Sequence, residues 1–196
     1  MDAPLRECLD RFVTLAGPTP AGIEPLAAAM RVLPAERGTD LFRQGEPDGN
    51  LYYLHRGLVR LGYLDTKGAA LTKSIVAEGG LFGSLKALAN GATASFTATA
   101  LEDSAVVRVP YAALEQAMAL DLRWERAARL VLQDLALAKE EREFELLTLT
   151  PTQRWTRLQG KRPDLVARVS QMELARLIGV TPVALSRIKG RARRGS

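Results

Sequence analysis

Residues 170–189 read SQMELARLIGVTPVALSRIK, and this stretch decides how the C-terminal part of the chain folds. Ser170 followed three residues later by Glu173 is the pattern of a capping box, in which the two side chains satisfy free backbone N–H groups at a helix start. A helix is therefore expected over residues 171–178. Its buried face would contain Met172, Leu174, Ala175 and Ile178.

A second helix is expected directly after the first. Gly179 can adopt the left-handed conformation that ends a helix, and Thr181 with Pro182 supplies a new N-cap and first-turn proline. About one and a half to two and a half helical turns would follow, with Leu185 and Ile188 inward. Helix, glycine turn and helix at this spacing is typical of a helix-turn-helix, whose second helix lies in the DNA major groove. An ordinary corner between two packed helices is the alternative.

Charge is divided unevenly along the chain. Residues 151–196 contain eleven Lys and Arg against only Asp164 and Glu173, a net charge of +9, whereas residues 1–150 carry −4. A basic segment on an acidic body indicates a polyanionic partner, and nucleic acid is the commonest soluble polyanion. The alternative is a basic face that is only solvated.

The direction of each side chain predicts its role at DNA. Arg187 is the candidate for base recognition because its guanidinium can donate two parallel hydrogen bonds to guanine O6 and N7. Other side chains would meet base edges or the sugar-phosphate backbone. These are Ser186, Thr181, Val183, Ser170 and Gln171, with Lys189, Arg191, Arg193 and Arg194 expected at phosphates.

Residues 111–149 contain no Gly or Pro. One short helix and then one long helix of about 25 residues is expected, with an apolar stripe that favours a partner helix and therefore a homodimer. Packing against the chain's own barrel is an alternative that can hold at the same time. Thr150 and Pro151 then predict a new helix start. The candidate dimerisation residues are Trp124, Ala127, Leu130, Val131, Leu137 and Phe144.

Residues 31–110 consist of short apolar runs separated by turn residues, which indicates an antiparallel β-barrel or jelly roll. A parallel sheet is excluded because its crossovers would need helices for which there is no room. Two short helices over residues 4–30 would cap the barrel. The expected strands include 40–42, 51–54, 58–64, 71–76 and 105–109.

The expected fold class is α+β, in three parts. A sensor domain with N-terminal helices covers 1–120, a dimerisation and linker helix 121–149, and an all-α helix-turn-helix domain 150–196. Only a short basic tail follows Ile188, too brief for a β-hairpin wing.

Several classes of function are disfavoured by the composition. Cys8 is the only cysteine, so one chain can form neither a disulfide nor a cysteine-ligated zinc or iron-sulfur site. His55 is the only histidine, and a structural or surface role is expected for it. Without a carboxylate pair, a nucleophile-base constellation or a phosphate loop, we expect no enzyme, no metal and no cofactor. Because no apolar run of about 18 residues and no secretory signal is present, we expect a cytoplasmic protein without a membrane partner.

The order of these parts resembles the family of cyclic AMP receptor and fumarate-nitrate (Crp/Fnr) regulators over nearly the whole chain. The stretches LFRQGEP at 41–47, LYYL at 51–54 and GLVRL at 57–61 are similar to its opening barrel strands. The stretches IGVTP at 178–182 and LSRI at 185–188 are similar to its recognition unit. The resemblance implies a cyclic-nucleotide-binding-like sensor, a dimer and a DNA-binding head.

The chain departs from the family at the phosphate-binding cassette, Gly-Glu-Leu followed by Arg-Ser. The matching residues are Gly83, Ser84 and Leu85, then Ala94 and Ser95, so Ser84 replaces the Glu and Ala94 the Arg. Losing a phosphate-paired cation costs about 2 to 5 kcal/mol, so cyclic AMP is not expected as a tight ligand. Pro182 and Val183 likewise replace the Arg and Glu of the cyclic AMP receptor, so its operator sequence does not carry over.

The sequence therefore predicts a homodimeric, sequence-specific transcription regulator that binds double-stranded DNA. An unknown effector would act through the barrel or a hinge at 149–151, and RNA polymerase is a further candidate partner. The alternative is a ligand-sensing or scaffold module whose basic segment binds polyanions or a protein without DNA sequence specificity.

Overall fold

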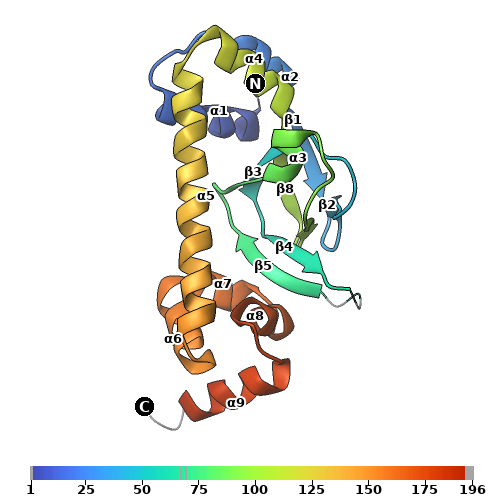
Figure 1. Cartoon of the computed structure of the whole chain (residues 1–196), viewed down its shortest axis with the longest axis vertical. Helices are drawn as coiled ribbons and strands as arrows, with labels where there is room; N and C mark the ends of the chain where they lie inside the picture. Colours follow the sequence, from blue (N-terminus) through green and yellow to red (C-terminus); the bar gives the residue numbers. More distant parts are fainter. Residues whose placement is uncertain (1, 67, 69, 193–196) are drawn as a thin grey trace.

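A β-barrel forms where the sequence has short apolar runs separated by turn residues. Within the residues that the structure, a computed structural model, describes (2–66, 68 and 70–192), eight strands form two four-stranded sheets, ordered β1-β8-β3-β6 and β2-β7-β4-β5. All strand pairs are antiparallel, which confirms the predicted jelly roll (Figure 1). The strands are β1 (Arg31–Ala35), β2 (Asp40–Phe42), β3 (Asn50–Arg56), β4 (Val59–Leu64), β5 (Ala70–Val76), β6 (Leu81–Phe82), β7 (Thr97–Ala100) and β8 (Ser104–Pro110).

Aromatic side chains fill the space between the two sheets. Tyr52 stacks on Phe82 with ring centroids 5.3 Å apart, and Phe42 lies 5.4 Å from Phe96. The turn between β3 and β4 requires glycine, since Gly57 has φ +107° and a Cβ there would lie 2.1 Å from the Ser104 hydroxyl. The barrel is thus a packed core with no room for a wide lumen among these rings.

Three helices cap one end of the barrel, two of them in the N-terminal region where the sequence predicted a cap. Cys8 is fully buried there, and this burial raises the pKa of its thiol to about 12. His55 Nδ1 lies 2.7 Å from a Glu7 carboxylate oxygen, which gives this histidine a structural partner. The helices are α1 (Ala3–Ala16), α2 (Ile23–Ala29) and α4 (Tyr111–Leu120).

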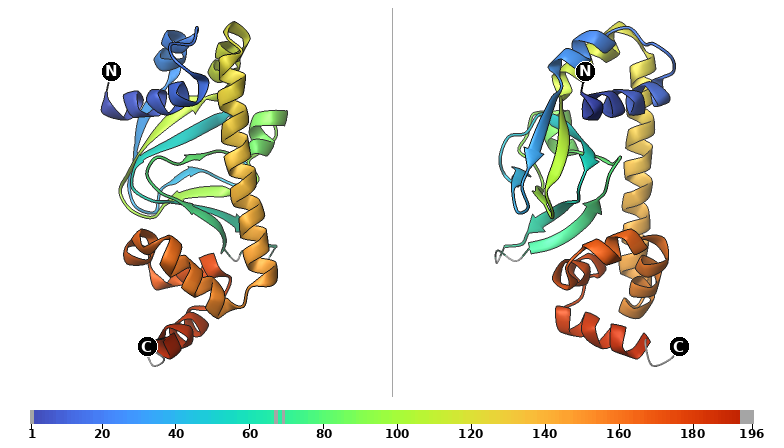
Figure 2. Two further views of the ribbon diagram at one scale, coloured as in Figure 1. Left: turned by 90° about the vertical axis from the view of Figure 1, so that its left-hand side faces the viewer. Right: turned by 180° about the vertical axis from the view of Figure 1, so that it is seen from behind.

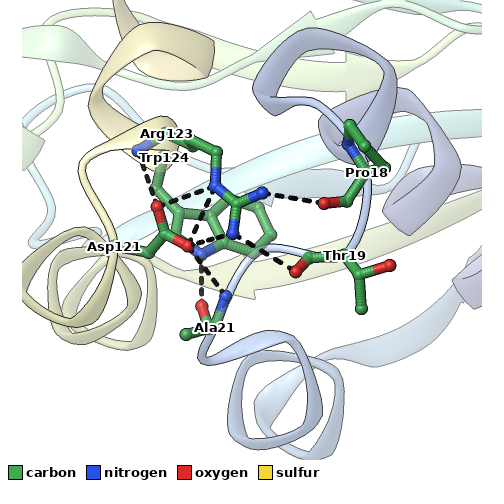
Figure 3. Close-up of polar contacts among 6 residues, drawn as sticks. All are labelled: Pro18, Thr19, Ala21, Asp121, Arg123 and Trp124. Atoms are coloured by element: carbon green, nitrogen blue, oxygen red, sulfur yellow. Dashed lines mark hydrogen bonds and ion pairs between the residues drawn. The ribbon is translucent and has the colours of Figure 1, made fainter.

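Helix α5 (Arg123–Thr148) has the predicted length and runs from the N-terminal helices to the C-terminal ones (Figure 2). Its first turn is fastened to the loop between α1 and α2, as Figure 3 shows. Trp124 Nε1 donates to the Ala21 carbonyl at 2.7 Å, and the Arg123 guanidinium donates to the Pro18 carbonyl at 2.8 Å. Asp121 in turn accepts from Arg123 and from the Ala21 N–H.

The C-terminal helices enclose a core of their own around Trp155. The Thr150 capping box with Gln153 starts the first of them at Pro151, as predicted. Leu58 and Ile75 of the barrel belong to the same cluster as Trp155, so the C-terminal unit is packed directly on the barrel. The helices are α6 (Pro151–Lys161), α7 (Pro163–Arg168), α8 (Gln171–Ile178) and α9 (Pro182–Ala192).

Three expectations about the C-terminal helices need correction. Helix α9 has 11 residues, so positions 189–191 belong to the helix and not to a tail. Met172 is exposed and Leu177 is buried in its place. Glu173 does not complete the capping box, because its carboxylate is bonded elsewhere.

In the part of the chain that the structure describes, no helix is both long and apolar enough to cross a membrane.

Candidate nucleic-acid interface and effector pocket

The corner between α8 and α9 is set by three local devices. The Ser170 hydroxyl accepts the Glu173 N–H at 3.3 Å and starts α8. Gly179 takes the left-handed conformation, with φ +72°, and its N–H bonds back to the carbonyls of α8. The Thr181 hydroxyl then accepts the Ala184 N–H at 3.2 Å and starts α9. The corner therefore forms as the sequence predicted.

Helix α9 has one buried face and one free face. Leu185 and Ile188 point into the Trp155 core, whereas Val183 is 61% exposed on the opposite side. Ser186, Arg187 and Arg191 share that exposed side, and among the described residues the Arg187 guanidinium has no hydrogen-bond or ion-pair partner. Five donor N–H groups of Arg187 are therefore available to a ligand.

Besides the capping hydroxyls of Ser170 and Thr181, two more of the predicted DNA contacts are engaged within the chain. Lys189 is half-buried, with its ammonium 5.2 Å from the centroid of the Trp155 ring. Gln171 Nε2 lies 3.4 Å from the Pro182 carbonyl and so links the starts of α8 and α9. Ser170 is exposed beside Gln171. Arg193 and Arg194, also predicted at phosphates, lie outside the described residues.

Helix α8 is docked on the barrel by a buried ionic cluster that the sequence analysis missed. The Glu173 carboxylate accepts from the Arg60 guanidinium at 3.1 Å, from Arg176 at 2.6 Å and from the Thr72 hydroxyl at 3.3 Å. Arg60 and Thr72 belong to β4 and β5, more than 100 residues away in the sequence. In Figure 1, α8 accordingly lies against β5, and α9 is the element farthest from the barrel.

A second ionic contact joins the start of this unit to the barrel. Arg168, at the end of α7, pairs with Glu78 at 2.6 Å and with Glu102. The Arg168 guanidinium lowers the pKa of Glu78 to about 2, chiefly through their hydrogen bonds. Because Arg168 and Glu173 face the barrel, neither competes with the free face of α9.

The cassette residues come together as a small neutral turn. Ser84 is fully buried, its hydroxyl lies 3.3 Å from that of Ser95, and it accepts the Ser95 N–H at 3.0 Å. Ala94 is buried, Leu85 begins the short helix α3 (Leu85–Asn90), and Gly83 lies close to the Asn50 carbonyl. Ser84 and Ser95 thus satisfy each other, while Ser84 and Ala94 stand where the family has an acid and a cation.

Gly83 and Leu85 also line a pocket of about 650 Å³. Its walls come from β5, the β6–α3 turn, one side of α5 and the helices α6 to α8. The pocket therefore borders the barrel, the long helix and the C-terminal helices, so a bound molecule would contact all three.

The predicted dimerisation residues divide into two groups. Trp124 and Ala127 are completely buried against α1 and the loop before α2, and Val131 is nearly so. The prediction that these three residues contact a partner chain is therefore wrong, because they are already buried within their own chain. Leu130 is half-buried, while Leu137 and Phe144 are 64% and 52% exposed, and further exposed apolar side chains on α5 include Leu132 and Leu147.

Comparison with known proteins agrees with this architecture. Residues 32–121 match the cyclic nucleotide-binding domain family. No curated protein matches the chain in sequence. The solved structure of FixK2 from Bradyrhizobium japonicum is similar over 85% of each chain, with a TM-score of 0.75 and 20% identity.

Two further solved structures are similar over most of their length. The c-di-GMP-responsive global regulator CLP of Xanthomonas campestris has a TM-score of 0.73 and 23% identity, over 89% of this chain and 91% of its own. A transcriptional regulator of the CRP family from Thermus thermophilus has a TM-score of 0.65 and 22% identity, over 83% and 85%. Residues 32–121 thus resemble a cyclic nucleotide-binding domain, and the chain has the fold of the Crp/Fnr transcription regulators.

Proposed function

We propose that this protein is a homodimeric transcription regulator that recognises a specific DNA sequence with α9. The observation that carries the proposal is the free face of α9, where Arg187, Ser186 and Val183 are exposed and point away from the Trp155 core. A helix that shows unpaired donors and small side chains on one exposed face suits the major groove, whose base edges offer acceptors and thymine methyl groups. The functional division is 1–120 for sensing, 121–149 for dimerisation and 150–196 for DNA binding.

Base and backbone contacts would be shared among the exposed residues of this unit. Arg187 reads guanine, Ser186 and Thr181 meet base edges or phosphate, and Val183 suits a thymine methyl group. Positioning contacts to phosphates fall to the remaining candidates. These are Arg191, Lys189, Gln171 and Ser170, of which Lys189 would have to leave the Trp155 ring.

Dimerisation is proposed through the C-terminal half of α5. Leu137 and Phe144 lie seven residues apart on its exposed side, and Leu130 continues the row toward the core. A stripe with this period is the pattern that pairs helices side by side. Two α5 helices paired in this way would present two copies of α9 to half-sites about 34 Å apart.

The sensor is proposed to respond to an effector other than cyclic AMP. Ser84 and Ala94 bring neither the acid for a ribose hydroxyl nor the cation for a cyclic phosphate, and the Ser84 hydroxyl already bonds to Ser95. An effector would change the relation of the barrel to the hinge at 149–151 and thereby the spacing of the two α9 helices. Calorimetry with cyclic AMP should detect no micromolar binding.

Selection of bound duplexes from a random library tests the proposed function. We expect a two-fold symmetric sequence to be enriched, and Arg187→Ala to weaken its binding at least tenfold, because the dimer loses two bidentate guanine contacts of about 1 to 3 kcal/mol each. Arg37→Ala is the matched control, since it removes the same charge from an exposed site on the barrel.

Two results would contradict the proposal. One is a loss of less than twofold in Arg187→Ala. The other is affinity that follows salt concentration alone with no enriched sequence, which would favour a module that binds polyanions nonspecifically.

A further inference from the structure

The pocket between β5 and α5 is lined mainly by apolar side chains, among them Leu61, Ile75, Phe82, Leu132 and Leu135. Its volume of about 650 Å³ suits a small organic molecule. The neutral cassette at Ser84 and Ser95 supplies no charge to it. The charged side chains of the pocket lie on β5, on α5 and on or directly after α6.

Most basic side chains that line the pocket already have partners. Arg157 and Lys161 pair with Glu141, and Arg162 pairs with Asp164. Arg142 and Arg154 donate to backbone carbonyls at the end of α8. The contacts of Arg157, Lys161 and Arg142 hold α6 and α8 against α5. All five basic side chains are thus engaged within the wall and are not free to bind a ligand.

Two lysines in the same lining differ from the rest. Among the residues that the structure describes, neither Lys73 of β5 nor Lys139 of α5 takes part in an ion pair or donates to a carbonyl. The Lys73 ammonium instead lies 4.1 Å from the centroid of the Phe96 ring, in the barrel core beside the cassette. It therefore brings a cation from β5 to the region where the cassette itself has none.

The surroundings of Lys73 disfavour a lone ammonium. Burial, and secondly the positive charge of Lys139, lower the pKa of Lys73 below its ordinary value. A ring face compensates only part of the lost hydration of a half-buried cation. An anion placed between the two lysines would remove both penalties, since it would neutralise Lys73 and screen it from Lys139.

We propose that this pocket binds a small organic anion with an apolar body, whose acidic group lies between Lys73 and Lys139. The inference rests on the proposed function in taking the pocket as the effector site of the regulator. The apolar body would contact Phe82, Ile75 and Leu135, and the acidic group would replace the missing partner of Lys73. Thr72, which precedes Lys73 on β5, bonds to Glu173 of α8, so the strand that contributes Lys73 is also the one on which α8 is docked.

The test uses the full chain and a fluorescent probe of the stated chemistry, 1-anilinonaphthalene-8-sulfonate. The wild type should bind it saturably, and Lys73→Met should weaken the binding about tenfold, because a charge-assisted contact is lost. Lys86→Met is the matched control, since Lys86 is an exposed lysine on α3 outside the pocket lining. It should leave the affinity unchanged.

A neutral probe of the same shape, N-phenyl-1-naphthylamine, separates charge from shape. It should bind Lys73→Met at least as well as the wild type, which also shows that the variant keeps a folded pocket. Equal sulfonate affinity in the wild type and Lys73→Met, or no saturable binding by the wild type, would overturn the inference. Because Lys73→Met should still bind the selected duplex, loss of the ligand site and loss of DNA recognition are distinguishable.

Discussion

Helices α8 and α9 are neighbours in one corner, yet their outer surfaces are used differently. On α8, the Glu173 carboxylate is hydrogen-bonded to the barrel residues Arg60 and Thr72. The outer side of α9 carries Arg187 and Val183 with no partner among the residues that the structure describes. The comparison shows how one helix pair can be fixed to the barrel through one helix and still leave a complete face of the other free for a ligand.

The largest expected effect concerns the buried face of α9. Leu185→Ala should lower the free energy of unfolding by about 3 kcal/mol, because it leaves a cavity in the Trp155 core. Val183→Ala, on the exposed side of the same helix, should change it by less than about 0.5 kcal/mol. Denaturant unfolding of both variants measures the difference, and equal effects would show that the two faces are not distinct.

A smaller effect is expected from the docking of α8. Glu173→Gln should destabilise the chain by about 2 to 3 kcal/mol, because it leaves the partly buried Arg60 without a carboxylate. Thermal and denaturant unfolding measure this loss. The double variant Arg60→Met, Glu173→Met should recover much of it, since the charge that remains, on Arg176, is about one third exposed to water. If Glu173→Gln has no effect, the ionic cluster does not hold α8 to the barrel.

The smallest effect concerns the Arg168 contact with Glu78. The folded pKa of Glu78, about 2, is below its ordinary value of 4.5, so the pair stabilises the fold above about pH 4.5 and loses this as the pH falls toward 2. Glu78→Gln should cost under about 1 kcal/mol at pH 6, since both side chains are about one third exposed. The difference from the wild type should shrink between pH 4.5 and pH 2.5, as thermal unfolding measured across that range would reveal. A difference that is constant with pH would exclude this linkage.

Much of the fold could be predicted because it depends on local signals. Helix α8 begins and ends at the predicted residues, since Ser170 and Gly179 act within one turn of their positions. The start of α6 follows Thr150 for the same reason. Strand β2 matches the expected run 40–42, and other strands differ from theirs only by one or two residues at their ends.

Other elements carry weaker local signals. Strand β1 contains Pro34, β6 has two residues, and β7 is the small-residue run TATA, so none of them shows a clear alternation of large apolar side chains. They form because neighbouring strands supply hydrogen bonds. Tertiary pairing of this kind is not visible in a local pattern.

The candidate site could be predicted in part. The placement of Arg187 and Ser186 on an exposed helix face follows from helical periodicity, because Leu185 and Ile188 fix the buried side. Glu173 fits a local capping box equally well, and only the distant Arg60 decides its role. The prediction of Trp124 on a partner surface is wrong because a stripe of apolar residues does not tell which stretch of α5 meets α1 of its own chain.

Methylation interference on the selected duplex tests most directly whether the free face of α9 reads bases. For the wild type, methylation of guanine N7 should block binding at two symmetry-related positions about one helical turn apart. For Arg187→Ala, binding should no longer respond to methylation at those two guanines. Interference that is identical in the wild type and the variant, or absent in both, would contradict the account.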